Sequence, residues 1–169
     1  VVEEDVAFGP ENLGVPTAEI RRRVDDALAA VGMEKFARHA PHLLSGGQKQ
    51  RIVIAMALVL NPGLILADEP TTALDVTVQA EILDLLRLAR DEFDASVLII
   101  THNMGVIADI ADQVVVMYRG HVVEQGDVEQ IFYHPKDDYT KLLLGAAPSL
   151  LHPDLAQFAQ DLDKKDLGR

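Results

Sequence analysis

The sequence contains no cysteine and no tryptophan, and it has far fewer basic than acidic residues. Without cysteine the chain has no disulfides and no thiolate metal sites, and it fits a reducing compartment. Lys and Arg number 15 against 27 Asp and Glu, so the formal net charge is -12. Because nonspecific nucleic-acid binders neutralise phosphates with clustered Lys and Arg, no nucleic-acid partner is expected. The short cluster Arg21-Arg22-Arg23 does not reverse this balance.

Two further absences limit what these residues do. No stretch approaches the ~18 consecutive apolar residues of a membrane span, so we expect a cytoplasmic protein. No segment spells G-x-x-x-x-G-K-[ST], the loop that cradles nucleotide phosphates. The 169 residues, 49% of them hydrophobic, suffice for one globular domain that buries roughly 70% of its unfolded surface.

The first part of the chain is predicted to be helical. A helix capped by Thr17 should end near Gly32, since glycine accepts the left-handed conformation common just past a helix. Its apolar face would consist of Ile20, Val24, Leu28 and Val31. A second helix is predicted to begin at Ser45-Gly46-Gly47 and to stop before Asn61-Pro62.

The middle of the chain predicts a parallel sheet. Residues 64–67 and 97–100 are almost entirely apolar, which is typical of strands buried on both faces. A helix over 76–93 should join them in a right-handed crossover. Strands at 113–118 and 121–124, with Arg119-Gly120 as a two-residue turn, predict a hairpin at the edge of the sheet.

The turn at Ser45-Gly46-Gly47-Gln48 suits an anion. Adjacent glycines let backbone N–H groups approach a phosphate, Ser45 adds a hydroxyl, and the following helix directs its positive dipole end there. An ordinary helix-capping turn would look the same on these residues alone.

Asp68 and Glu69 follow the first apolar strand directly, and His102 follows the second. Open parallel sheets place ligand groups at the carboxyl ends of their strands, so these side chains are expected on one rim. The alternative interpretations are that the two carboxylates only cap the turn before Pro70 and that His102 has a purely structural role. Asp75 is in addition a candidate N-cap for the next helix. The other histidines have no metal-ligand spacing and are predicted to lie on the surface.

These segments resemble the ATP-binding cassette (ABC) family. The stretch 44–48 is similar to its signature loop, 64–69 to its Walker B strand, 70–75 to its D-loop, and His102 to its switch histidine. The resemblance implies an α/β fold: a partial P-loop NTPase of ABC type, with a mostly parallel sheet, flanking helices and a small helical subdomain. The expected parts are 1–60 with the signature loop and its helix, 61–146 with the remaining motifs, and a tail at 147–169.

The resemblance also implies residue roles, with ATP and Mg²⁺ as cofactors. Ser45, Gly46, Gly47 and Gln48 would contact the terminal phosphate of ATP held by an opposite subunit. Asp68 would hold Mg²⁺, Glu69 would act as general base or orient the attacking water, and His102 would contact the terminal phosphate of ATP. The loop that contains Asp75 would cross the interface between the two subunits. Lys49 and Arg51 are predicted to lie on a solvated helix face.

Different parts of the chain are similar to different branches of the family. Residues 2–14 and 40–43 resemble the cobalt, nickel and vitamin importers of the energy-coupling-factor type, whereas 54–58 and 67–79 resemble the oligopeptide and dipeptide importers. The resemblance implies an importer ATPase, with peptides as the expected solute, on the inner face of the cell membrane. Its partners would be permease subunits and a second ATPase subunit.

Two other functions fit the same motifs. One is a noncatalytic remnant or regulatory subunit that lends a signature loop to a partner, which the missing phosphate loop favours. The other is a soluble DNA-repair ATPase, which predicts coiled-coil insertions and basic surfaces that the sequence lacks. Without the phosphate loop, the chain by itself is expected to bind MgATP poorly and to have exposed strand edges in its sheet.

Overall fold

The computed structural model describes residues 1–146. The chain divides into two units, of which the first is Val1–Ile100 and the second begins at Thr101. The first unit contains α1 (Val2–Asn12), α2 (Thr17–Ala30), the 3-10 turns η1 (Glu34–Phe36) and η2 (Pro41–Leu43), α3 (Gly46–Leu58), β1 (Leu64–Asp68), α4 (Val76–Phe93) and β2 (Ser96–Ile100). The second unit contains α5 (Met104–Ile110), β3 (Gln113–Tyr118), β4 (His121–Asp127), α6 (Val128–Tyr133) and α7 (Asp138–Gly145). The predicted division into 1–60, 61–146 and 147–169 stays a prediction, and its tail lies outside the described residues.

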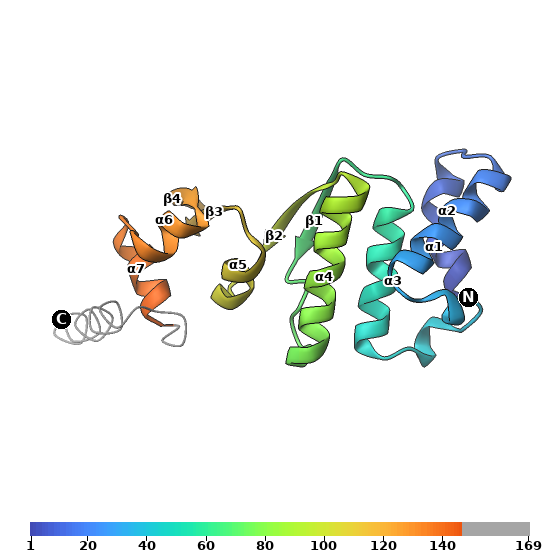
Figure 1. Cartoon of the computed structure of the whole chain (residues 1–169), viewed down its shortest axis with the longest axis horizontal. Coiled ribbons are helices and arrows are strands. Elements are labelled where there is room, and N and C mark those ends of the chain that lie inside the picture. Colours follow the sequence, from blue (N-terminus) through green and yellow to red (C-terminus); the bar gives the residue numbers. More distant parts are fainter. Residues whose placement is uncertain (147–169) are drawn as a thin grey trace. The chain divides into compact units, whose positions relative to one another are not determined.

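The first unit is a set of helices packed on one side of a two-stranded parallel sheet. In Figure 1, α4 runs alongside β1 and β2, with α3 beside α4 and then α1 and α2. The strands pair in parallel from Leu64 opposite Ser96 to Asp68 opposite Ile100, as predicted. One core joins the helices to the sheet, and among its most buried residues are Val2, Leu28, Val31, Ala55, Ile82 and Ala89.

The prediction that both strands are buried on both faces is wrong for this unit. Side chains alternate along β1, with Ile65 and Ala67 buried toward the helices. The opposite face is bare, because no element of residues 1–100 packs on it. Its apolar side chains are each more than half exposed: Leu64, Leu66, Leu98 and Ile100. Among residues 1–146 only two strands form this sheet, so each also has an open edge, as the sequence predicted.

The helix boundaries follow local chemistry. Ser45 caps α3, and Asp75 caps α4. Gly32 lies just past α2 with φ +67, the left-handed conformation expected of a glycine there. Thr17, however, is the first residue of α2, and no side chain caps this helix, so the predicted Thr17 cap is wrong.

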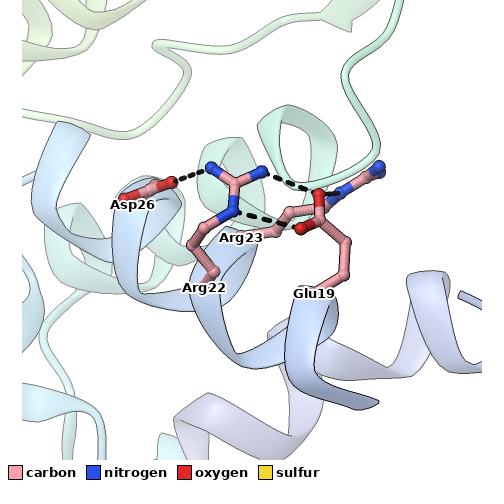
Figure 2. Close-up of polar contacts among 4 residues, drawn as sticks. All are labelled: Glu19, Arg22, Arg23 and Asp26. Carbon is pink, nitrogen blue, oxygen red and sulfur yellow. Dashed lines mark hydrogen bonds and ion pairs between the residues drawn. The ribbon is translucent and has the colours of Figure 1, made fainter. Parts of the chain in front are cut away.

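The arginine cluster of α2 is balanced by acids of the same helix (Figure 2). Glu19 accepts hydrogen bonds from Arg22 and Arg23 at 2.7 and 2.8 Å, and Arg22 also pairs with Asp26 at 3.0 Å. The bonds from Arg22 and then Arg23 lower the pKa of Glu19 to about 2. All these partners lie one helical turn apart, so the network stiffens α2 without joining it to another element.

The second unit is built on the predicted hairpin, which forms a sheet of its own. β3 and β4 pair antiparallel, and the turn residues Arg119 and Gly120 have φ of 49 and 81. Two consecutive positive φ values mark the turn type that matches strand twist. The predicted place at the edge of the parallel sheet is wrong, because no strand of the parallel sheet pairs with the hairpin in the described part of the chain.

A buried carboxylate joins the hairpin to the chain that follows it. Glu124 of β4 is 9% exposed, and it accepts hydrogen bonds from the backbone N–H groups of Lys136 at 2.8 Å and Asp137 at 3.0 Å. The side chain of Gln130 donates a third bond at 3.0 Å. Burial raises the pKa of Glu124, but these donors outweigh it and hold the pKa below the usual 4.5. The ionised carboxylate therefore fixes the start of α7 against β4.

We predict that Glu124→Gln destabilises the second unit by about 1–3 kcal/mol at pH 7, because the amide places a donor against backbone donors. Since the folded-state pKa is depressed, this stabilisation is complete above pH 4.5 and is lost as the pH falls through the folded-state pKa. Hydrogen exchange of the β3 and β4 amides would measure it. Glu129→Gln, at an exposed position of α6, is the control; equal effects of the two variants would contradict the prediction.

Candidate functional site

The turn before α3 presents free backbone donors. Ser45 and Gln48 cap the helix reciprocally: the N–H of Gln48 donates to Ser45 Oγ at 3.3 Å, and the N–H of Ser45 donates to Gln48 Oε1 at 2.9 Å. Among residues 1–146, the N–H groups of Gly46 and Gly47 have no acceptor. Unpaired N–H groups at a helix start, together with the helix dipole, are suited to bind an anion.

The same turn packs against the start of α4. A Cβ on Gly47 would lie 2.6 Å from Cγ1 of Val78, and a Cβ on Gly46 would lie 3.9 Å from Cδ2 of Leu74. Gly47 is therefore required by close packing, since a side chain there would overlap a stiff β-branched neighbour. The structure thus brings the turn at 45–48 and the segment around Asp75 together.

Asp75 has the N-cap role that the sequence allowed. Its Oδ1 accepts the N–H of Val78 at 3.0 Å, and the residue is exposed. One carboxylate oxygen is thereby used within the chain. The second function expected of Asp75, a contact across a subunit interface, stays a prediction.

Asp68 and Glu69 end β1 side by side. Asp68 is exposed and is the last paired residue of the strand, opposite Ile100. Glu69 donates its N–H to the carbonyl of Ile100 at 2.8 Å, and its Oε2 accepts the hydroxyl of Thr72 at 2.8 Å. Its φ of 47 lies in the left-handed region, which is costly for a residue with a side chain. Strain of this kind clusters at functional positions.

His102 lies two residues past β2, at the start of the second unit, and is exposed. The next residue, Asn103, caps α5 by accepting the N–H groups of Gly105 at 3.0 Å and Val106 at 3.3 Å. His102 thus sits in a short linker between β2 and α5. Its predicted place on one rim with Asp68 and Glu69 stays a prediction. His39, His42, His121 and His134 are exposed, as predicted, and His152 lies outside the described residues.

Residues 1–72 match a family model described as ABC transporter. The oligopeptide transport ATP-binding protein OppD of Bacillus subtilis (strain 168) is 48% identical over 149 residues, which cover 86% of this chain and 41% of OppD. The glutathione import ATP-binding protein GsiA of Escherichia coli (strain K12) is 51% identical over 132 residues, covering 78% of this chain and 21% of GsiA. Among solved structures, CbiO1 of Clostridium perfringens, described as part of the ABC transporter complex CbiONQ, matches with a TM-score of 0.73 and 39% identity, over 79% of this chain and 53% of that one. The chain belongs to the ABC family.

Membership confirms the α/β, ABC-type fold class predicted from the sequence. Both branches of the predicted resemblance are represented, because OppD carries an oligopeptide name and CbiO1 belongs to a CbiONQ complex. The chain spans about half the length of the solved relative and less than half of OppD and GsiA. The described residues include no helix that is both long and apolar enough to cross a bilayer.

The residues at the end of β1 fit the magnesium ion that accompanies ATP in such proteins. Within residues 1–146 no three His, Cys, Asp or Glu side chains cluster as a metal cage. Mg²⁺ does not need one, because it keeps several waters and takes one or two carboxylates together with substrate phosphates. An exposed carboxylate such as Asp68 at a strand end fits that mode of binding.

The prediction that Arg51 lies on a solvated helix face is wrong. Its guanidinium donates to the carbonyl of Val31 at 2.8 Å and to Oε2 of Glu81 at 2.9 Å. The partners lie 20 and 30 residues away in the sequence, so no local pattern marks this bridge. The hydroxyl of Thr72 on Glu69 was also not predicted, although it lies only three residues away.

Proposed function

We propose that this chain is the signature-bearing part of an ATP-binding and ATP-hydrolysing subunit of an ABC importer. One observation carries the proposal: the free N–H groups of Gly46 and Gly47 lie in the same 100-residue unit as the consecutive carboxylates Asp68 and Glu69. A donor set for a phosphate and a carboxylate pair for a metal and a water are the elements of phosphoryl transfer that a protein supplies.

Each residue has a distinct part in the proposed reaction. The N–H groups of Gly46 and Gly47, with the hydroxyl of Ser45, donate hydrogen bonds to the terminal phosphate of ATP held by an opposite subunit, and Gln48 keeps the turn in shape. Glu69 orients the attacking water and accepts its proton. His102 donates to the phosphate as negative charge develops on it. Asp68 holds Mg²⁺, which when bound neutralises charge on the phosphates.

The strained backbone of Glu69 supports its assignment as the base. A φ of 47 directs this residue out of the regular path of β1, while the bonds to Ile100 and Thr72 hold both its backbone and its carboxylate. The hydroxyl of Thr72 limits rotation of the side chain. A carboxylate held in this way can keep one water in line for attack.

The proposed site is shared between two subunits. Two or three hydrogen bonds to a charged phosphate contribute about 1.5–3 kcal/mol each. Association costs roughly 4–15 kcal/mol at standard state, so the turn at 45–48 does not hold ATP alone. A second ABC subunit with a phosphate loop is therefore a required partner, and Asp75 would face it.

We infer a peptide as the transported solute, on the strength of the OppD and GsiA matches at 48% and 51% identity against 39% for CbiO1. The subunit would act on the inner face of the cell membrane, bound to its permease. The noncatalytic alternative is favoured by the absence of G-x-x-x-x-G-K-[ST] from these 169 residues. This alternative gives Glu69 no part in catalysis. A substitution of Glu69 therefore distinguishes it from the proposed function.

A groove on the first unit is a suitable surface for the permease. It has a volume of about 570 Å³ and lies between α1, η2 and α3. Its apolar lining includes Phe8, Val53 and Met56, which are 63%, 56% and 37% exposed. Three acidic side chains and one basic side chain border it, namely Glu4, Asp5, Glu11 and Lys49. Cytoplasmic loops of membrane proteins are rich in Lys and Arg, so a basic, amphipathic permease segment complements the groove.

In a subunit completed by a nucleotide-binding part that carries a phosphate loop, Glu69→Gln is expected to slow hydrolysis by ~10² to 10⁴, the range for loss of a general base. ATP affinity should stay the same, since the amide has the shape of the carboxylate and still accepts the bond from Thr72. Phosphate release and nucleotide binding measure the two effects. Glu92→Gln, at an exposed position near the opposite end of α4, is the control. Unchanged turnover of Glu69→Gln would remove Glu69 from catalysis and favour the noncatalytic alternative.

We predict that Val53→Arg weakens binding to the cognate permease in detergent by about tenfold or more, because it replaces an apolar contact with a charge that repels a basic segment. Leu13→Arg is the matched control, since Leu13 is 72% exposed in the same unit and does not line the groove. Surface plasmon resonance gives both affinities. Equal affinities for Val53→Arg and the unchanged chain would exclude this groove as the docking surface.

A further inference from the structure

Arg51 joins three helices of the first unit. It lies on α3, one turn beyond Gly47, and its side chain is 24% exposed. Nη1 donates to the carbonyl of Val31 just past the end of α2, and Nη2 donates to Glu81 of α4. One planar guanidinium therefore ties α3 to α2 and to α4 at the same time.

The bond to Val31 is a capping interaction. The last carbonyls of a helix have no partner within the helix, and Val31 is completely buried. The guanidinium supplies the missing donor, and its Nη1 would lie 3.7 Å from a Cβ on Gly32. A positive charge at a helix end is also favourable to the dipole. The end of α2 thus depends on a side chain of α3.

The bond to Glu81 adds a directional contact between α3 and α4 to the close approach of their glycine and valine. Gly47 approaches Val78, and Arg51 and Glu81 follow one turn further along both helices. A glycine contact alone lets two helices slide or tilt, whereas a second, directional contact one turn away fixes their relative rotation. Two contacts in register define the position of one helix start against the other.

From these contacts, and resting on the proposed function, we propose that Arg51 is a positioning residue. By bridging Val31 and Glu81, it makes the signature turn at 45–48 and the Asp75 turn one rigid body. Both turns would face the same opposite subunit, so they would approach it together.

The energy of the bridge is consistent with positioning rather than bulk stability. Glu81 is 47% exposed, and ion pairs this open contribute little to the free energy of unfolding. Loss of the Glu81 bond should therefore leave the unit folded while loosening the two turns, and loss of the Val31 bond should in addition loosen the end of α2. The pairs of Arg22 with Glu19 and Asp26 have similar lengths but stay within α2, so they provide a matched control.

Hydrogen exchange on the 169-residue chain tests the positioning directly. Arg51→Met should raise exchange at residues 45–50 and at 76–80 together, by about 3- to 10-fold. Glu81→Gln, which keeps a hydrogen-bond acceptor but loses the charge, should raise both by a smaller factor. Arg22→Met should change neither segment. An increase at 45–50 with none at 76–80, or no increase at either, would overturn the proposal.

Steady-state kinetics of the completed subunit separates this proposal from the proposed function. Arg51→Met should lower kcat by roughly 10-fold with little change in KM for ATP, and Arg51→Lys, which can make only one of the two bonds well, should recover part of it. If the unchanged subunit hydrolyses no ATP while exchange still responds at both turns, the proposed function fails and the positioning stands. If the unchanged subunit is active and Arg51→Met matches it in kcat, the positioning fails.

Discussion

The close packing of α3 on α4 is the contact on which the rest of the first unit depends. Gly47 is the point of closest approach, because a single added carbon would lie 2.6 Å from Val78. That approach sets the helix spacing, and with it the place of the signature turn beside Asp75. The other helix contacts, including the bridge of Arg51 to α2, are arranged around it. A local requirement for glycine thus fixes an arrangement of residues nearly thirty positions apart.

The sequence predicted the elements that local chemistry decides. Ser45 and Asp75 indicate helix starts, apolar runs indicate the parallel strands β1 and β2, and Arg119-Gly120 indicates a hairpin. Each of these signals lies within a few residues of the structure that it determines. It could not predict Arg51, whose partners are remote, or the Glu124 carboxylate, whose donors follow it by 12 and 13 residues. The sequence of an apolar strand also does not show which of its two faces is covered by other elements.

The bare face of the β1–β2 sheet and the phosphate site both lack the groups that would complete them. Leu64, Leu66, Leu98 and Ile100 leave an apolar surface exposed, and the signature turn offers donors without a nucleotide-binding loop beside it. Apolar surface of this kind is stabilised by covering it. The described residues therefore form a unit whose chemistry and whose packing both call for further polypeptide, and OppD, of which the chain covers 41%, has that additional length.

Calorimetric titration of MgATP tests the central claim, that this chain supplies donors and carboxylates to a shared site and does not form a nucleotide site alone. The titration is made into the 169-residue chain, and then into the chain mixed with a complete ABC subunit that binds but does not hydrolyse ATP. We predict no micromolar complex with the chain alone, and ATP-dependent association of the two proteins in the mixture. A stoichiometric micromolar complex with the isolated chain would contradict it.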